Sequence, residues 1–325
     1  MAQALSEAAL LALVDRLADG GWHSGEQLAS ECGISRAALA KRIEKLKDWQ
    51  LLIEARQGLG YRLGAPIERL NQAALQSQID VPLQVLAVTD STNSQLMNSA
   101  SARDPQILLA EYQTAGRGRR GREWLSPFAA QLAFSIAWSF DAMPPQLSAL
   151  PLAVGTVCAR VLHQYNVVSA RIKWPNDLIA HQRKLAGILL EHRGEGGGGC
   201  RVVIGVGLNL ALQAVQAQSV TQPWINLGEA LSARAPMPSR NDLAANLLRA
   251  LVALLRDYPR HGFSQCVADY ARFDATNNQA VRVLMGERVI DGIARGIDDD
   301  GALLVDAAGT RHTLHAGEVS LRLSP

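Results

Sequence analysis

The stretch that decides the fold of the central part of this chain is GRGRRGREWLSPFAAQLAFSIAW, residues 116–138. Its first seven residues contain three glycines and four arginines. Glycine lets the backbone adopt positive φ and approach a ligand closely, and arginine presents a planar fork of donors that stays charged. Residues 116–122 therefore predict a loop that closes over a phosphate, with a solvated basic surface loop as the ordinary alternative.

The glycines Gly116, Gly118 and Gly121 also fit the G-x-G-x-x-G pattern of dinucleotide-binding folds, in which the helix that follows receives the pyrophosphate. This chain continues instead with Pro127 and a strand-like apolar run over residues 131–138. A P-loop is excluded as well, because no Gly-Lys-Ser/Thr follows. We therefore expect a flexible anion clamp, whose mutually repelling guanidiniums stay poorly ordered until a phosphate binds.

The segments around this loop alternate between strand-like and helical patterns. Apolar stripes with helical spacing predict helices over residues 150–161 and 243–256. We expect residues 66–275 to form one α+β domain built on a mixed sheet. The apolar runs that predict its strands cover residues 83–88, 106–110, 131–138, 184–191 and 201–210.

The N-terminal part of the chain has the pattern of a winged helix-turn-helix. Helices are predicted over residues 5–18 and 24–29, and a third, basic helix begins after the N-cap Ser35. A pair of short strands follows within residues 51–63. This order predicts a DNA-binding domain over residues 1–65.

The charges of this domain are unevenly distributed. Residues 1–65 contain eight basic and eight acidic side chains, whereas residues 34–47 contain five basic and one acidic. DNA recognition uses such a local concentration of positive charge, because phosphate contacts dominate the affinity. An amphipathic helix with a solvated lysine face, or a protein-docking module, would have the same pattern. The candidate DNA contacts are Ser35, Arg36, Lys41 and Arg42.

Residues 276–325 differ in character from the rest of the chain. Short strand-like runs, separated by Gly or Asp turns, predict a small barrel-like β domain. These runs cover residues 281–284, 287–290, 292–297, 301–306 and 310–314.

The composition is typical of a folded, multi-domain protein. A chain of 325 residues that is 48% apolar suits two or three domains, and its net charge of +2 confines any basic partner surface to a local patch. The four cysteines are far apart and lack metal-ligand spacing, as in proteins of a reducing compartment. The N-terminal residues lack a signal-peptide pattern, and no apolar run reaches transmembrane length. We expect a cytoplasmic protein with no membrane contact.

Three further motifs carry candidate chemistry. Asn176 and Asp177, in the stiff motif KWPND, could supply oxygens to Mg²⁺ or form an ordinary turn. Lys184 precedes Ala-Gly at the start of a strand, where backbone can approach a ligand, although a solvated edge lysine fits too. Ser91 and Thr92 either cap a helix or bind a polar ligand. No nucleophile–histidine grouping is visible, so these groups favour phosphate chemistry without covalent catalysis.

In this order, the motifs resemble those of bifunctional biotin–protein ligases that also repress the biotin operon. GRGRRGR at 116–122, KWPND at 173–177 and RKLAG at 183–187 are the most specific part of a resemblance that extends over nearly the whole chain. SGEQL, SRAA, DSTN, AEYQ and EVSLR, which begin at residues 24, 35, 90, 110 and 318, complete it. The resemblance implies a class II synthetase-like central domain and a C-terminal SH3-like β-barrel.

The resemblance also implies a reaction and a second activity. The biotin carboxylate would attack the α-phosphate of ATP, supplied with Mg²⁺, to give biotinyl-5′-adenylate and pyrophosphate. A lysine of a biotin carboxyl carrier protein would then take the biotin. The adenylate-bound protein would form a homodimer that binds operator DNA, and no tightly bound metal is expected.

Residue roles follow from the same resemblance. It assigns catalysis to Lys184, Arg117 and Arg119, which would neutralise carboxylate and phosphoryl oxygens. Biotin and adenylate binding falls to Ser91, Thr92, Asn93, Gln113, Gly116, Arg117, Gly118, Arg119, Lys184 and Gly187. The nucleotide side comprises Arg122, Lys173, Asn176, Asp177, Trp224 and Arg322, with Asn176 and Asp177 as the candidate Mg²⁺ ligands.

Two features depart from the family pattern, and two other functions stay open. A glycine-rich insertion at residues 194–199 lies near the expected dimer edge, and Thr114 interrupts the approach to the arginine loop. A lipoate–protein ligase is the enzymatic alternative. A DNA-binding biotin sensor without ligase activity is the alternative from another class.

Overall fold

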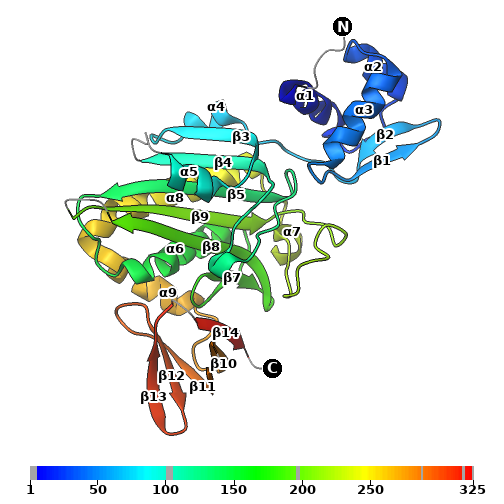
Figure 1. The fold of residues 1–325 in the computed structure, drawn as a ribbon. Coiled ribbons are helices and arrows are strands. Elements are labelled where there is room, and N and C mark those ends of the chain that lie inside the picture. Colours follow the sequence, from blue (N-terminus) through cyan, green and yellow to red (C-terminus); the bar gives the residue numbers. More distant parts are fainter. Residues whose placement is uncertain (1–5, 100–104, 195–197, 287, 317–318, 324–325) are drawn as a thin grey trace.

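The structure, a computed structural model, describes residues 6–99, 105–194, 198–286, 288–316 and 319–323. Its strands form a two-stranded, a seven-stranded and a five-stranded sheet. The seven-stranded sheet and its helices occupy the middle of the molecule, and the other two sheets lie at opposite ends of it (Figure 1).

The N-terminal elements follow the order expected for a winged helix-turn-helix. Ser35 is the N-cap of the third helix, and its Oγ accepts a hydrogen bond from the Ala38 amide at 3.2 Å. The first helix buries the apolar stripe that its helical spacing predicts. The elements are α1 (Glu7–Leu17), α2 (Gly25–Glu31), α3 (Arg36–Lys47), β1 (Ile53–Arg56) and β2 (Gly60–Leu63).

The central sheet is mixed, as expected, because its first two strands are parallel and the other neighbouring pairs are antiparallel. The chain passes from the arginine loop into β5 with only a 3₁₀ turn at Arg119–Gly121, so no α-helix follows the glycines. In spatial order the strands are β3 (Leu83–Thr89), β4 (Gln106–Gln113), β5 (Gln131–Phe140), β9 (Cys200–Asn209), β8 (Arg183–Gly194), β7 (Asp177–Ala180) and β6 (Arg171–Lys173).

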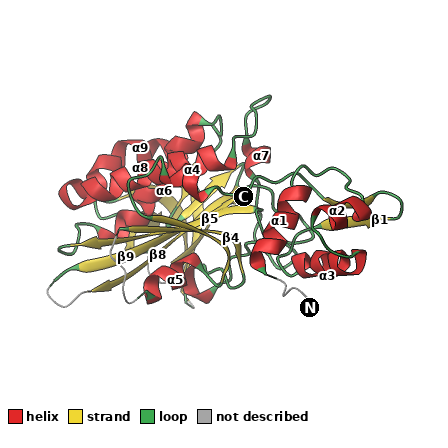
Figure 2. Ribbon diagram, turned by 90° about the horizontal axis from the view of Figure 1, so that it is seen from above, coloured by secondary structure: helices red, strands yellow, loops and turns green. Residues whose placement is uncertain are grey.

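The helices are divided unequally between the two faces of this sheet. Figure 2 shows α4, α6, α8 and α9 on one face and α5 on the other. Among the described residues, no helix is long and apolar enough to span a membrane. The helices are α4 (Gln72–Gln76), α5 (Thr92–Asn98), α6 (Leu150–Gln164), α7 (Leu227–Ala230), α8 (Arg240–His261) and α9 (Val267–Phe273).

The alternation of side chains along β9 separates a core face from an open face. Ile204 and Val206 belong to the core that α6 and α8 cover. The residues of opposite parity, Gly205, Gly207 and Asn209, line a cavity on the α5 side. Because side chains alternate along a strand, two glycines in alternate positions leave one face of β9 bare.

The C-terminal sheet is antiparallel throughout and departs from the expected strands in two places. The expectation of separate strands over 287–290 and 292–297 is wrong, since β11 is continuous; Glu287 itself lies outside the described residues. Asp291, which suggested a turn, faces Arg282 on the next strand, with 2.7 Å between Oδ1 and Nε. In the order β13-β12-β11-β10-β14, the strands are β13 (Thr310–Leu314), β12 (Leu303–Ala307), β11 (Arg288–Ile297), β10 (Ala280–Met285) and the unexpected β14 (Val319–Leu323).

Candidate active site

One cavity of about 780 Å³ lies on the α5 side of the central sheet. Its walls come from the start of α5, the arginine loop, strands β5, β8 and β9, and the C-terminal strand β14. Apart from Gly116, every residue that the sequence assigns to biotin, adenylate or nucleotide binding lines it. These residues are Ser91, Thr92, Asn93, Gln113, Arg117, Gly118, Arg119, Arg122, Lys173, Asn176, Asp177, Lys184, Gly187, Trp224 and Arg322.

Gly116 lies at the base of the arginine loop. Its carbonyl oxygen accepts a hydrogen bond from the Trp124 amide at 2.8 Å. A Cβ at Gly116 would lie 2.2 Å from the Trp124 carbonyl oxygen, so a larger residue would push the two loop strands apart. Gly116 therefore sets the shape of the loop.

One wall of the cavity carries a cluster of buried, uncharged polar groups. Ser91 caps α5, with its Oγ 3.5 Å from the Ser94 amide, and it lines the cavity as well. The Thr92 amide donates to Gln113 Oε1 at 2.9 Å. Ser135, which the sequence did not single out, donates its hydroxyl to Thr92 Oγ1 at 2.7 Å. Such a preorganised set of donors and acceptors suits a neutral polar ring system.

The arginine loop forms another wall of the cavity, and its Arg117 reaches the polar cluster, where NH1 donates to Ser94 Oγ at 3.4 Å. The Arg117 guanidinium pairs with Glu191 at 3.0 Å, and Arg119 donates to Asn176 Oδ1 at 3.0 Å. Arg119 also donates to the carbonyl oxygen of Ala316, in the C-terminal part of the chain. The expectation of a poorly ordered loop differs from this arrangement, because partners distant in the sequence already hold two of its arginines.

The electrostatic environment of the cavity is strongly positive. Burial lowers the pKa of Lys173, against the opposing effect of Asp177. The charges of Lys184 and Arg322 lower the pKa of Lys173 further. Burial likewise lowers the pKa of Arg119. Because these cations repel one another and are partly desolvated, an anionic ligand would relieve an unfavourable arrangement.

The candidate Mg²⁺ ligands are largely committed to protein partners. Asn176 Oδ1 accepts from Arg119, and its Nδ2 donates to the Ile188 carbonyl oxygen at 2.7 Å. Asp177 Oδ1 lies 2.9 Å from Lys184 Nζ. No group of three or more His, Cys, Asp or Glu residues within the described ranges could hold a metal. The residues present therefore suit Mg²⁺ only as an ion that arrives with nucleotide phosphates.

Trp124 is the main cavity residue that sequence reasoning missed. Its indole covers the bare face of β8 and β9, where a Cβ on Gly207 would lie 2.4 Å from the ring and one on Gly187 would lie 3.1 Å from it. Lys184 Nζ lies 5.3 Å from the ring centroid. Gly187 and Gly207, which pair across β8 and β9, make room for this flat group, whereas Gly205 makes room for the Asn93 side chain.

In another wall of the cavity, the loop before α7 is hydrogen-bonded to the backbone of Lys184. The Lys184 amide donates to the Pro223 carbonyl oxygen at 2.9 Å, and the Ile225 amide donates to the Lys184 carbonyl oxygen at 2.9 Å. Trp224 between them therefore borders the cavity from a backbone position that is hydrogen-bonded on both sides. Arg322, on β14, reaches the same cavity from the C-terminal sheet.

The four candidate DNA contacts are separate from this cavity and are not equivalent. Ser35, Arg36 and Lys41 are exposed on α3, whereas Arg42 is buried at 8% exposure. Arg42 is therefore turned toward the domain's interior and is poorly placed to reach DNA. The basic residues at the end of α3 are partly neutralised, since Lys45 pairs with Asp48 and Lys47 with Glu44.

Fold and site together define a class of protein in which a helix-turn-helix is joined to a cationic ligand-binding domain. Family models divide the chain in the same way. The "Biotin/lipoate A/B protein ligase family" matches residues 84–209, the "Biotin protein ligase C terminal domain" residues 276–322, and the "HTH domain" residues 10–62.

Individual relatives match over most of their length. "Bifunctional ligase/repressor BirA" of Salmonella typhimurium is 41% identical over 314 residues, 96% of this chain and 97% of that protein. The biotin–[acetyl-CoA-carboxylase] ligase of Mycobacterium tuberculosis is 38% identical over 245 residues, 73% of this chain and 88% of the relative. The chain belongs to the family of bifunctional biotin–protein ligases and repressors.

A solved structure shares the fold of the ligase part. Biotin protein ligase from Aquifex aeolicus, in complex with biotin and ATP, superposes with a TM-score of 0.63 at 24% identity. The match covers 75% of this chain and 99% of that chain.

Proposed function

We propose that this protein uses ATP to activate biotin as biotinyl-5′-adenylate and then transfers the biotin to a lysine of a biotin carboxyl carrier protein. The observation that carries the proposal is the convergence, in one cavity, of a buried polar cluster with the cations of the arginine loop and Lys184. A polar ureido ring with a carboxylate tail needs the first environment, and a triphosphate needs the second.

The residues suit two successive displacements. In the first, a biotin carboxylate oxygen bonds to the α-phosphorus of ATP, and the bond from that phosphorus to its bridging oxygen breaks to release pyrophosphate. In the second, the acceptor amine bonds to the activated acyl carbon, AMP leaves with the electron pair of the broken C–O bond, and the nitrogen releases a proton to solvent. Arg117, Arg119 and Lys184 would stabilise the negative charge in both steps, and removal of one such donor typically costs ~10²–10³ in rate.

Mg²⁺ enters this scheme as the counter-ion of ATP. When bound, it would neutralise phosphate charge. Asp177 is the protein residue suited to meet it, because one of its oxygens is not committed to Lys184 in the contacts described above. We assign Trp224, which lines the cavity, to the face of the adenine.

The decisive experiment is a mass measurement of a purified carrier domain after incubation with the protein, biotin and Mg·ATP. We expect the mass increase of one biotin, and no increase when lipoate replaces biotin. Lys184→Ala should abolish the labelling while it leaves the thermal unfolding of the protein intact. Labelling by lipoate alone would favour the lipoate–protein ligase, and labelling by neither would favour a sensor without ligase activity.

We further propose that the adenylate-bound protein is a homodimer that represses the biotin operon. The exposed Arg36 and Lys41 on α3 support a DNA contact. Operator binding should tighten with biotin and ATP and weaken steeply with salt, because phosphate contacts release counterions. Gel shifts that respond to neither ligand would refute the repressor role and spare the ligase.

The finer fold assignments belong to the same proposal. We assign the central domain to the class II synthetase type and the five strands after residue 276 to an SH3-like barrel. Domain boundaries near residues 65 and 275 complete this division.

A further inference from the structure

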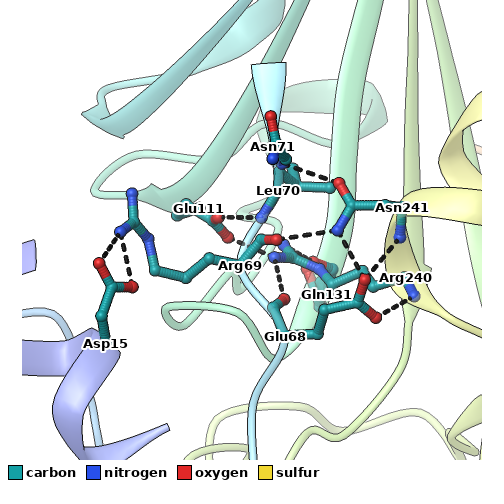
Figure 3. A network of polar contacts seen from close by, with 9 residues as sticks. All are labelled: Asp15, Glu68, Arg69, Leu70, Asn71, Glu111, Gln131, Arg240 and Asn241. Atoms are coloured by element: carbon teal, nitrogen blue, oxygen red, sulfur yellow. Dashed lines mark hydrogen bonds and ion pairs between the residues drawn. The ribbon is translucent and has the colours of Figure 1, made fainter. Parts of the chain in front are cut away.

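A buried ion pair outside the cavity joins β4 to the start of α8. Glu111 is 2% exposed and Arg240 is 5% exposed, and the guanidinium NH1 contacts Glu111 Oε2 (Figure 3). A buried pair costs desolvation and is retained where further hydrogen bonds satisfy both partners. Those further bonds extend in two directions.

In one direction the pair holds the segment that leaves the helix-turn-helix. Glu111 Oε1 accepts from the Leu70 amide at 2.6 Å, and Arg240 NH1 donates to the Glu68 carbonyl oxygen at 3.1 Å. The Glu68 carboxylate accepts in turn from the Arg240 amide at 2.6 Å. Arg69, between them, pairs with Asp15 of α1 at 2.7 Å. The linker is thus fixed to the central domain and to the first helix (Figure 3).

In the other direction the pair holds the first residue of β5. Arg240 NH2 donates to the Gln131 carbonyl oxygen at 2.8 Å. The Gln131 side chain accepts from Trp124 Nε1 at 2.8 Å and donates to Asn209 Oδ1 at 2.8 Å. Gln131 therefore orients the indole on the cavity floor and the end of β9 at the same time.

Asn209 extends this set of bonds to Lys184. Its Nδ2 donates to the Lys184 carbonyl oxygen at 3.2 Å, and the Lys184 ammonium lies over the Trp124 ring. The Lys184 backbone therefore contacts Asn209 and its ammonium contacts Trp124, and the Gln131 side chain is hydrogen-bonded to both of these residues. Neither Glu111 nor Arg240 is among the residues that line the cavity.

We propose that Glu111 and Arg240 are positioning residues of the active site, which act through Gln131 on Trp124 and Lys184. Because Glu111 also binds the linker at Leu70, the same pair sets the active-site floor and the entry of the N-terminal domain. The effect on ligation rests on the proposed function, whereas the effect on the Trp124 side chain does not.

The first test compares Glu111→Gln with Gln131→Met. Glu111→Gln keeps the volume and an acceptor for Leu70 but removes the charge opposite Arg240. Gln131→Met removes the partners of Trp124 and Asn209 and leaves the ion pair in place. We expect each to lower kcat/KM for biotin by ~10- to 100-fold, the range over which small misplacements act. The double variant should be no worse than the more severe single variant.

A structural role alone would give another pattern. Val252 lies on the buried face of α8, the helix that begins at Arg240. Val252→Ala is therefore the control that lowers stability without touching Gln131. It should lower the thermal midpoint and leave kcat/KM for biotin unchanged. If Glu111→Gln behaves like this control, or if the losses of the two variants multiply in the double variant, the positioning role is wrong. Arg240→Lys is the second variant should Glu111→Gln fail to fold.

The second test needs no ligand and no turnover. The indole N–H resonance of Trp124, assigned with Trp124→Phe, should shift in Gln131→Met and also in Glu111→Gln, and should stay in place in Val252→Ala. An unshifted resonance in Glu111→Gln would overturn the proposal. A shifted resonance in a protein that fails to biotinylate any carrier would retain the positioning role and reject only the ligase function.

Discussion

The two terminal domains are attached to the central domain in different ways. The N-terminal helices have a core of their own, and of the central-domain residues that the structure describes, only Tyr112, Phe128 and Ala129 join it as buried residues. The C-terminal strands have no separate core among the described residues. Val283 and Leu303 belong to the same apolar cluster as the central sheet and its helices.

Individual contacts show the same difference between the two terminal domains. The indole of Trp174, a residue that lines the cavity, donates to the Gly301 carbonyl oxygen at 3.0 Å. At the N-terminal junction Trp49 stacks on Phe128, with ring centroids 5.2 Å apart. The C-terminal sheet is therefore part of the catalytic body, and the helix-turn-helix is a module held by a small interface and a fixed linker.

The largest expected effect comes from removing each domain. Deletion of residues 276–325 exposes the shared core, so we expect the remainder to lose cooperative unfolding. Deletion of residues 1–65 leaves that core intact, and a cooperative transition should remain. Circular dichroism melts of both truncated proteins measure the difference, and a cooperative melt without residues 276–325 would contradict it.

A smaller effect is expected from matched cavities in the two cores. Leu303 and Leu13 are both fully buried, and Leu→Ala at either should cost ~2–5 kcal/mol. Leu303→Ala should destabilise the central transition and reduce biotin transfer near the midpoint temperature. Leu13→Ala should destabilise only the helix-turn-helix. Calorimetry with a parallel labelling assay separates the two, and a loss of transfer in Leu13→Ala would break the comparison.

The stacked pair at the N-terminal junction should matter less. Phe128→Leu keeps apolar volume but removes the stack on Trp49, which is worth ~0.5–1.5 kcal/mol. We expect faster proteolysis within residues 64–71 and an unchanged central melting transition. Phe273→Leu is the control, because its edge contact with His163 lies within the central domain, with centroids 4.8 Å apart. Equal proteolysis of the two variants would show that the stack does not hold the module.

The smallest effect concerns two acids whose pKa values shift in opposite directions. Burial opposes the shift at Glu68, but hydrogen bonds from Asn241, Arg240 and Ser239 lower its pKa. Burial raises the pKa of Asp274, which precedes the C-terminal strands. An acid whose pKa is lowered in the folded state stabilises the fold at pH values above its unfolded-state pKa. This stabilisation is lost as the pH falls through the folded-state pKa. An acid whose pKa is raised in the folded state contributes stability at pH values below its unfolded-state pKa. This contribution is lost as the pH rises through the folded-state pKa.

Acidification should therefore loosen the N-terminal junction through Glu68, whereas protonation of Asp274 should favour the C-terminal junction. Between about pH 5 and 3 the linker contact of Glu68 should weaken by less than ~1 kcal/mol, since the group is exposed. Linker proteolysis by an acid-stable protease should rise over this range and should lose its pH dependence in Glu68→Gln. Asp274→Asn should slightly raise the melting temperature at neutral pH, because an ionised carboxylate there is unfavourable.

Much of the fold and site could be predicted, because their signals are local. Ser35 as an N-cap, the apolar stripe of α1 and the strand after Pro127 were all readable from neighbours a few residues apart. The motifs at 116–122 and 173–177 indicated a phosphate site, with Asn176 and Asp177 as possible Mg²⁺ ligands. Trp124 could not be assigned from its neighbours in the sequence, because the glycines that make room for its indole, Gly187 and Gly207, lie on other strands.

The sequence by itself indicated most helices and strands in their order, the strand that follows the arginine loop and the motifs that line the cavity. These depend on periodicity, turn chemistry and motif order, which act over short distances along the chain. Only the tertiary structure decided that Arg42 is buried while Arg36 is exposed, and that Arg240 pairs with Glu111, 129 residues away. The reason is physical, because burial and the pairing of charges depend on what packs nearby, and that depends on the whole fold.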